Sequence, residues 1–268
     1  MRLPLYSDGE NNPMRTGFFL LLFIFSIFSP STWAADIVLV ADPWPPFNIQ
    51  PGSDREGYLV DVARAVLEPA GHTVTYKIVP WKRAIDGTRA GRYTGAIGAS
   101  KTDAAGFVFP DEELARNVLS FYTRTDNPWR FEGPASIEIV SIGVAAGYDY
   151  RRWLNDYIRV HRGNDRRVQV VAGANPLKQN LQKLLLNRID VVVDTEAAIR
   201  FTAKEMGILE AIHAAGYGVE PAYIYIAFSP ALPESPKLAN QLSEGIADLR
   251  RSGRLQSILD CYGLRDWK

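Results

Sequence analysis

The chain has 268 residues, 47% of them hydrophobic, and its 30 basic and 30 acidic residues leave no formal net charge. This balance excludes the basic footprint that nucleic acids or anionic membranes attract, so we expect no nucleic-acid partner. The one cysteine, Cys261, excludes an internal disulfide, and no His or Cys spacing typical of a metal site is present. We therefore expect no cofactor and a fold held by its apolar core.

The beginning of the chain resembles a targeting signal. Arg15 precedes residues 18–28, which are almost all apolar, and Thr32-Trp33-Ala34 follows them. A basic start, a short apolar run and a small-x-small exit are typical of a secretory signal peptide, and the run is too short to span a membrane. The sequence predicts a signal peptide over 1–34, cleaved after about Ala34, with 1–13 a misassigned start. No cysteine suitable for lipid attachment follows, so we expect a soluble periplasmic protein.

The first half of the remaining chain alternates between strand and helix patterns. Short β-branched or apolar runs predict strands over 37–41, 73–79, 95–99 and 119–125. Helical spacing predicts helices over 59–67 and 82–89. The first strand is followed by a proline-rich segment, 42–47, in which regular structure cannot form.

The second half repeats this alternation. It predicts strands over 137–144, 168–171, 190–193 and 223–228, and helices over 150–160, 175–187 and 196–206. Asp149 is expected to cap the first of these helices. Apolar residues at helical spacing predict a helix through 238–249 and a short one after Gly253. Because strands alternate with helices in two series, the sequence predicts two α/β lobes with mainly parallel sheets.

Six segments, in order, resemble the bacterial periplasmic solute-binding proteins of the polar amino acid class, family 3 type, which serve ABC importers. They are Asp42-Pro-Trp-Pro-Pro-Phe47, Gly57-Tyr-Leu-Val-Asp61, Gly91-Arg-Tyr-Thr-Gly-Ala-Ile-Gly98, Arg188-Ile-Asp-Val-Val-Val-Asp194, Tyr225-Ile-Ala-Phe-Ser-Pro230 and the tail over 254–262. The resemblance covers nearly all of the chain after the signal. It implies the type II periplasmic binding protein fold, in which two lobes joined by two hinge strands close on a ligand.

In that arrangement the first lobe comprises 35–120 plus 227–268, and the second comprises 121–226. The hinge crossings fall near 121–125 and 222–226. The resemblance further implies a monomer that delivers a small polar solute to an inner-membrane ABC permease without catalysing a reaction.

One departure from the family bears on the ligand. Relatives that bind α-amino acids carry Thr-x-x-Arg after the third strand, and the arginine clamps the ligand's carboxylate. Here the segment begins at Thr102, and Ala105 stands at the arginine's position. Arg83 and Lys101 are the nearest cations that would replace it, although a solvated surface charge is the more ordinary role for each. The sequence thus favours an amine-bearing ligand over an α-amino acid.

The resemblance also implies which residues contact the ligand. Trp44 and Trp81 would supply aromatic faces, the alternative being that they pack in the core. Asp194 would hold an ammonium group, or cap the following helix, or both. Asp42 would be a second acidic contact or an Asx turn before its proline.

Small and polar residues complete the predicted site. Ser100 would offer a hydroxyl, Gly98 would let the ligand approach the backbone, and the Gly147-Tyr148 loop would offer N–H groups. No nucleophile or phosphate-loop motif is present. Two alternatives remain open: a dehydratase-like enzyme on the same fold, with Asp42 as its candidate acid or base, and a detached ligand-sensing module.

Overall fold

The computed structural model describes Met1, residues 34–173 and residues 175–268. All but two residues of the predicted signal peptide lie outside the described residues. The fold below belongs to a single unit, Thr32–Lys268. None of the helices within the described ranges is both long enough and apolar enough to cross a membrane.

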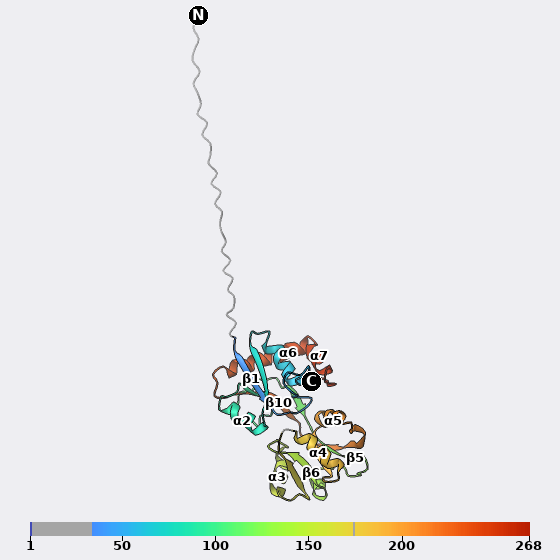
Figure 1. The fold of residues 1–268 in the computed structure, drawn as a ribbon. Helices are drawn as coiled ribbons and strands as arrows, with labels where there is room; N and C mark the ends of the chain where they lie inside the picture. Colours follow the sequence, from blue (N-terminus) through green and yellow to red (C-terminus); the bar gives the residue numbers. More distant parts are fainter. Residues whose placement is uncertain (2–33, 174) are drawn as a thin grey trace. The chain divides into compact units, whose positions relative to one another are not determined.

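The first lobe is built on a five-stranded sheet with the order β2-β1-β3-β10-β4. Figure 1 labels two of these strands, β1 and β10. Its strands are β1 (Asp36–Ala41), β2 (Thr73–Ile78), β3 (Gly95–Ala99), β4 (Ala115–Asn117) and β10 (Ala222–Phe228). β1 runs parallel to both β2 and β3, whereas β10 runs antiparallel to β3 and β4. The sheet is therefore mixed, with the expected parallel strands on one side of β10.

The second lobe repeats this plan in the order β7-β6-β8-β5-β9. Its strands are β5 (Leu119–Arg124), β6 (Ile142–Ala145), β7 (Val168–Val171), β8 (Val191–Thr195) and β9 (Ile212–Tyr217). β6 is parallel to β7 and β8, and β5 is antiparallel to β8 and β9. Each lobe thus has the sheet of a type II periplasmic binding protein, as the sequence predicts.

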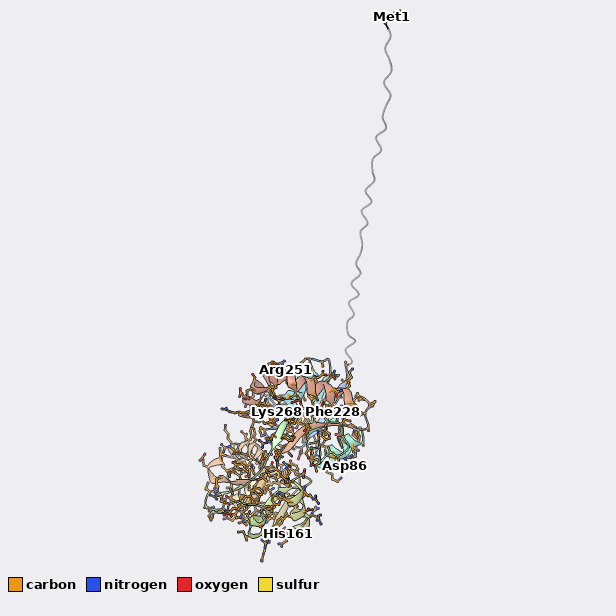
Figure 2. The ribbon with its side chains drawn as sticks, turned by 180° about the vertical axis from the view of Figure 1, so that it is seen from behind. Met1, Asp86, His161, Phe228, Arg251 and Lys268 are labelled. Carbon is orange, nitrogen blue, oxygen red and sulfur yellow. The ribbon has the colours of Figure 1, made fainter. Side chains whose placement is uncertain are left out.

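Helices pack on both sheets through apolar faces. The first lobe carries α1 (Tyr58–Leu67), α2 (Trp81–Arg89), α6 (Ser235–Arg251) and α7 (Arg254–Asp260), and the second carries α3 (Arg152–His161), α4 (Pro176–Leu185) and α5 (Glu196–Glu205). In α6 the buried positions include Leu238, Leu242, Ile246 and Leu249, which is the predicted face. Figure 2 labels Arg251 and Lys268, which mark the end of α6 and of the chain on the first lobe.

The predicted strand over 137–144 is the clearest error in the element predictions. Pro134–Ile139 forms a 3₁₀ helix, η1, and only Ile142–Ala145 is extended, as β6. Pro134 stands at the first helical position, where its fixed φ favours a helical start, and Gly133 precedes it at φ 115°. The short strands β4 and β9 have no counterpart in the sequence prediction, nor does the single 3₁₀ turn η2 (Leu209–Ala211).

The chain passes between the sheets twice. It leaves the first sheet after Asn117 and enters the second at Leu119, and it returns between Tyr217 and Ala222. These two short segments are candidate hinges. They lie close to the predicted crossings, and the lobe boundaries given above remain a prediction.

Candidate ligand-binding site

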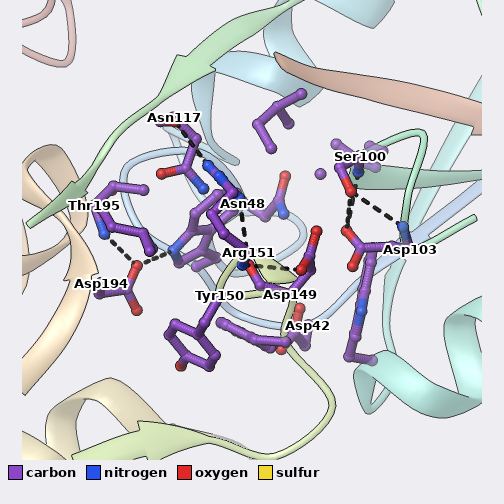
Figure 3. Close-up of a pocket in the computed structure, with 17 residues that line it drawn as sticks. Asp42, Asn48, Ser100, Asp103, Asn117, Asp149, Tyr150, Arg151, Asp194 and Thr195 are labelled. Atoms are coloured by element: carbon purple, nitrogen blue, oxygen red, sulfur yellow. Dashed lines mark hydrogen bonds between the residues drawn. The ribbon is translucent and has the colours of Figure 1, made fainter. Parts of the chain in front are cut away.

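A small cavity of about 40 Å³ is lined by side chains from both lobes (Figure 3). Seven predicted site residues line it: Asp42, Trp44, Trp81, Gly98, Ser100, Tyr148 and Asp194. Most of them lie at or just after the carboxyl ends of β1, β3, β6 and β8. The ends of parallel strands meet at one edge of a sheet, and this edge is where ligands bind in open α/β folds. The two lobes therefore present these edges to one cavity.

Two hydrogen bonds from aromatic side chains join the lobes at this cavity, beside the bond from Arg151 of the second lobe to the carbonyl oxygen of Asn117 in β4. The indole Nε1–H of Trp44 donates to Oδ1 of Asp194 at 3.0 Å, and the hydroxyl of Tyr148 donates to Oδ2 of Asp42 at 2.7 Å. Each bond pairs an aromatic donor of one lobe with a carboxyl group of the other. The Trp44 ring also stacks on Phe47, with centroids 4.2 Å apart, and meets Tyr148 edge-on. The two lobes are consequently bonded to each other across the cavity in this conformation.

The two carboxyl groups are electrostatically unusual. Burial raises the pKa of both Asp42 and Asp194 to about 6, although the hydrogen bonds from Tyr148 and Trp44 act in the opposite direction. The nearby charge of Asp42 raises the pKa of Asp194 further. Desolvation penalises the charged form of a buried acid, so these groups gain most from a partner that carries positive charge.

Asp194 is not the cap of the helix that follows it. Thr195 caps α5, because its side chain accepts the Ala198 N–H, while Asp194 Oδ1 accepts the N–H of Thr195. The carboxyl group of Asp194 therefore faces the cavity and Trp44.

Asp149 is likewise not the cap of α3. Its Oδ1 accepts the backbone N–H of Arg151, two residues on, as in an Asx turn. Arg151 stands at the N-cap position with φ 74°, a left-handed conformation that is costly for a residue with a Cβ. The turn places Arg151 in the lining of the cavity.

Gly98 has the geometry that a close backbone approach requires. Its φ is 95°, and an added Cβ would lie 3.2 Å from Nδ2 of Asn48 and 3.6 Å from the Trp44 ring. Any other residue here would be strained and would crowd the cavity. Ser100, two residues further on, is buried, and its hydroxyl donates a hydrogen bond to Oδ2 of Asp103 at 2.9 Å.

Three predicted residues lie away from the cavity lining. Arg83 is exposed on α2, and Gly147 borders a separate depression beside α3. Lys101 extends over the rings of Tyr225 and Phe109, with its Nζ 5.0 and 6.0 Å from their centroids. Lys101 is exposed, which agrees with the alternative given above, a solvated surface charge.

Sequence reasoning missed several lining residues: Asn48, Asp103, Asn117, Asp149, Tyr150 and Arg151. Asp103 had a weak local signal, since a serine three residues earlier invites a capping-type exchange of hydrogen bonds. Arg151 had none, because an arginine at a helix start is ordinarily a solvated charge. Within the described residues no group of three or more His, Cys, Asp or Glu side chains is arranged to hold a metal ion.

Fold and site together define a two-lobe solute-binding protein. Residues 37–265 match the family of bacterial extracellular solute-binding proteins, family 3. Since the match spans most of the chain, the protein belongs to this family and binds a small solute. None of the curated protein sequences compared with the chain matches it.

Solved structures share the fold at low sequence identity. A histidine kinase sensor domain with similarity to periplasmic binding proteins is 19% identical, with a TM-score of 0.69 over 86% of this chain and 98% of its own. A structure from work on glutathione import through GshT and the cystine importer TcyBC of Streptococcus mutans is 17% identical, with a TM-score of 0.71 over 86% and 95%. An ABC uptake transporter substrate-binding protein from Streptococcus pneumoniae, with bound histidine, is 16% identical, with a TM-score of 0.69 over 85% and 92%.

Proposed function

We propose that this chain is a non-catalytic periplasmic binding protein that takes up a small polar or amine-bearing solute and presents it to an inner-membrane ABC permease. The observation that carries the proposal is the cavity between the lobes, whose buried carboxyl groups Asp42 and Asp194 come from opposite lobes. A solute held by both groups stabilises the closed form, because it bonds to each lobe at once.

The size of the cavity supports a hinge motion. About 40 Å³ has room for little more than a water molecule, whereas small-molecule sites usually enclose about 300 Å³ or more. A solute therefore needs the lobes to separate and the bonds Trp44–Asp194 and Tyr148–Asp42 to break or rearrange. The candidate hinges are the short crossing segments, 117–119 and 217–222.

Residues 35–268, purified as the secreted chain, provide the direct test. Thermal unfolding is measured with and without each member of a set of small amines, amino acids and neutral solutes. A ligand present at 100 times its Kd adds about 2.7 kcal/mol to the free energy of unfolding, which gives a clear rise in Tm. A true ligand also lowers the radius of gyration in solution scattering. A ligand that raises Tm and leaves that radius unchanged contradicts the hinge motion.

A sensory role is the second candidate, and the fold shared with a histidine kinase sensor domain is the observation that favours it. The two roles differ in partner. An importer protein, loaded with ligand, stimulates ATP hydrolysis by a reconstituted permease, whereas a detached sensor changes the autophosphorylation of a membrane kinase. For the dehydratase-like alternative, Asp42 is the residue to examine, and turnover of a bound ligand during incubation is its signature.

A further inference from the structure

Two donors at the cavity that could bind an anion, the N–H and the hydroxyl of Ser100, already donate to the carboxylate of Asp103. Oδ2 of Asp103 accepts both the backbone N–H of Ser100, at 3.0 Å, and its hydroxyl, at 2.9 Å. In return the Asp103 N–H donates to Ser100 Oγ at 3.1 Å. Both residues line the cavity, directly after the end of β3, and Figure 3 shows the pair. A ligand carboxylate would compete with Asp103 for these donors.

The one arginine of the lining is also engaged. Nη2 of Arg151 donates to the carbonyl oxygen of Asn117 at 2.9 Å, and its Nε donates to that of Glu220 at 3.2 Å. The charges of Asp149 and Asp103 act on the same guanidinium group. The positive charge of Arg151 is thus held against backbone carbonyls and faced by two carboxylates, which leaves little attraction for an incoming anion.

Some buried hydrogen-bond acceptors of the lining, by contrast, have no partner among the described residues. Oδ1 of Asn48 and Oδ1 of Asn117 are buried in the lining and have no hydrogen-bond partner within the part of the chain that the structure describes. A buried acceptor without a partner destabilises the protein, and a ligand that donates a hydrogen bond to it removes that cost. Four carboxyl groups line the same cavity: Asp42, Asp103, Asp149 and Asp194. The cavity therefore suits a ligand that donates hydrogen bonds and carries positive charge.

We propose that Asp103 is a built-in carboxylate that excludes ligands bearing a carboxylate beside their amine, so that the site selects small organic cations without one. The proposal rests on the proposed function, because it assigns the class of solute that the cavity binds. Asp103 determines specificity in two ways. Its carboxylate fills the donors of Ser100, and its charge repels a second carboxylate.

Pairs of compounds that differ by one carboxylate test this directly: putrescine and ornithine, cadaverine and lysine, agmatine and arginine, histamine and histidine. Calorimetric titration of the wild-type chain should show binding of at least one amine, with its amino acid partner bound at least about tenfold more weakly, which corresponds to about 1.4 kcal/mol. In Asp103→Ala the preference should fall by a similar factor, because both the Ser100 donors and the charge are released. Asp103→Asn removes the charge but keeps an oxygen that can accept from Ser100, so its preference should fall less.

Asp126→Ala, at an exposed position outside the lining of the cavity, is the matched control and should keep the wild-type preference. Circular dichroism establishes that each variant is folded. Tight binding of an amino acid by the wild-type chain overturns the exclusion while leaving solute binding intact, and so does an unchanged preference in Asp103→Ala. Absence of binding for every pair overturns the cation assignment, and in a screen that also finds no other ligand it overturns the proposed function as well.

Discussion

Trp44 and Asp194 are 150 residues apart in sequence, yet the indole N–H of one donates to the carboxyl group of the other at 3.0 Å across the lobes. Together with the bond from Tyr148 to Asp42, this contact joins the two lobes across the cavity. The same carboxyl groups are the proposed ligand contacts. The hydrogen bonds between the lobes and a bound ligand therefore compete for the same acceptors.

Removing the indole donor should shift the protein further toward an open form. Trp44→Phe keeps a ring beside Phe47 but deletes a hydrogen bond to a buried carboxyl group, a contribution of roughly 1.5–3 kcal/mol if the acceptor is charged. We expect a larger radius of gyration in solution scattering without ligand. Trp129→Phe is the control, since Trp129 donates to Ser136 O within the second lobe, also at 3.0 Å. Equal radii of gyration for the two variants would contradict a role of the Trp44–Asp194 hydrogen bond in holding the lobes together.

The stability of the protein should depend on pH through Asp194. Its pKa is about 6 in the folded chain and about 3.8 when unfolded, so the folded state binds more protons between these values. The free energy of unfolding therefore falls as pH rises from about 4 through 6, because the buried acid must ionise.

Asp194→Asn removes this cost and keeps an oxygen that can accept from Trp44 and Thr195. We expect the variant to gain stability relative to the wild-type chain as pH rises from 4 to 7.5, by up to roughly 3 kcal/mol for a shift of this size. Urea unfolding at several pH values measures the difference. A difference in the free energy of unfolding that stays constant with pH would show that Asp194 does not titrate in this range. The control, Asp126→Asn, should have the same stability as the wild-type chain.

Arg151 should matter for stability through two separate effects. Arg151→Ala leaves the carbonyl oxygens of Asn117 and Glu220 without their donor, at a cost of roughly 1–3 kcal/mol. Arg151→Gly loses the same bonds but relieves the φ of 74°, so it should be more stable than the alanine variant by about 1 kcal/mol. Chemical unfolding compares them with Arg152→Ala, an exposed neighbour. Alanine and glycine variants of equal stability would argue against backbone strain.

Gly98 should be less tolerant of a side chain than a glycine with open space. Gly98→Ala and Gly52→Ala both place alanine at positive φ, 95° and 74°, which costs roughly 1–2 kcal/mol at each position. Only at Gly98 does the new Cβ meet Asn48 and Trp44, whereas nothing lies within 4 Å at Gly52. We therefore expect Gly98→Ala to lose ligand binding as well as stability. Calorimetry with an identified ligand checks this, and unimpaired binding would place the ligand away from Gly98.

The mature protein should begin at Ala35. The apolar run over 18–28 and the exit sequence ending at Ala34 predict cleavage there during export. N-terminal sequencing of protein recovered from the periplasmic fraction of an expressing bacterium measures it directly. Recovery of the chain with Met14 intact, or only in the membrane fraction, would refute the prediction.

The sequence by itself determined the plan of the fold. The alternating strand and helix patterns predict most of the elements, and six short segments in order identify the family, because hydrophobic spacing and strand-end motifs are local properties. It also named seven lining residues, since strand ends in this fold face the ligand. The resemblance also predicts, without a structure, that Ala105 stands where relatives carry the clamp arginine.

Only the tertiary structure decided which side chains are hydrogen-bonded to one another around the cavity. Trp44 and Asp194, or Arg151 and Glu220, are brought together by the packing of two lobes, and no local pattern encodes such a pair. The left-handed turn at Arg151 and the 3₁₀ helix η1 replaced a predicted helix start and a predicted strand, because the Asx turn of Asp149 and a proline outweighed the local patterns. The hydrogen bonds between Ser100 and Asp103 are local, three residues apart, but the position of this pair in the lining of the cavity is a property of the folded chain alone.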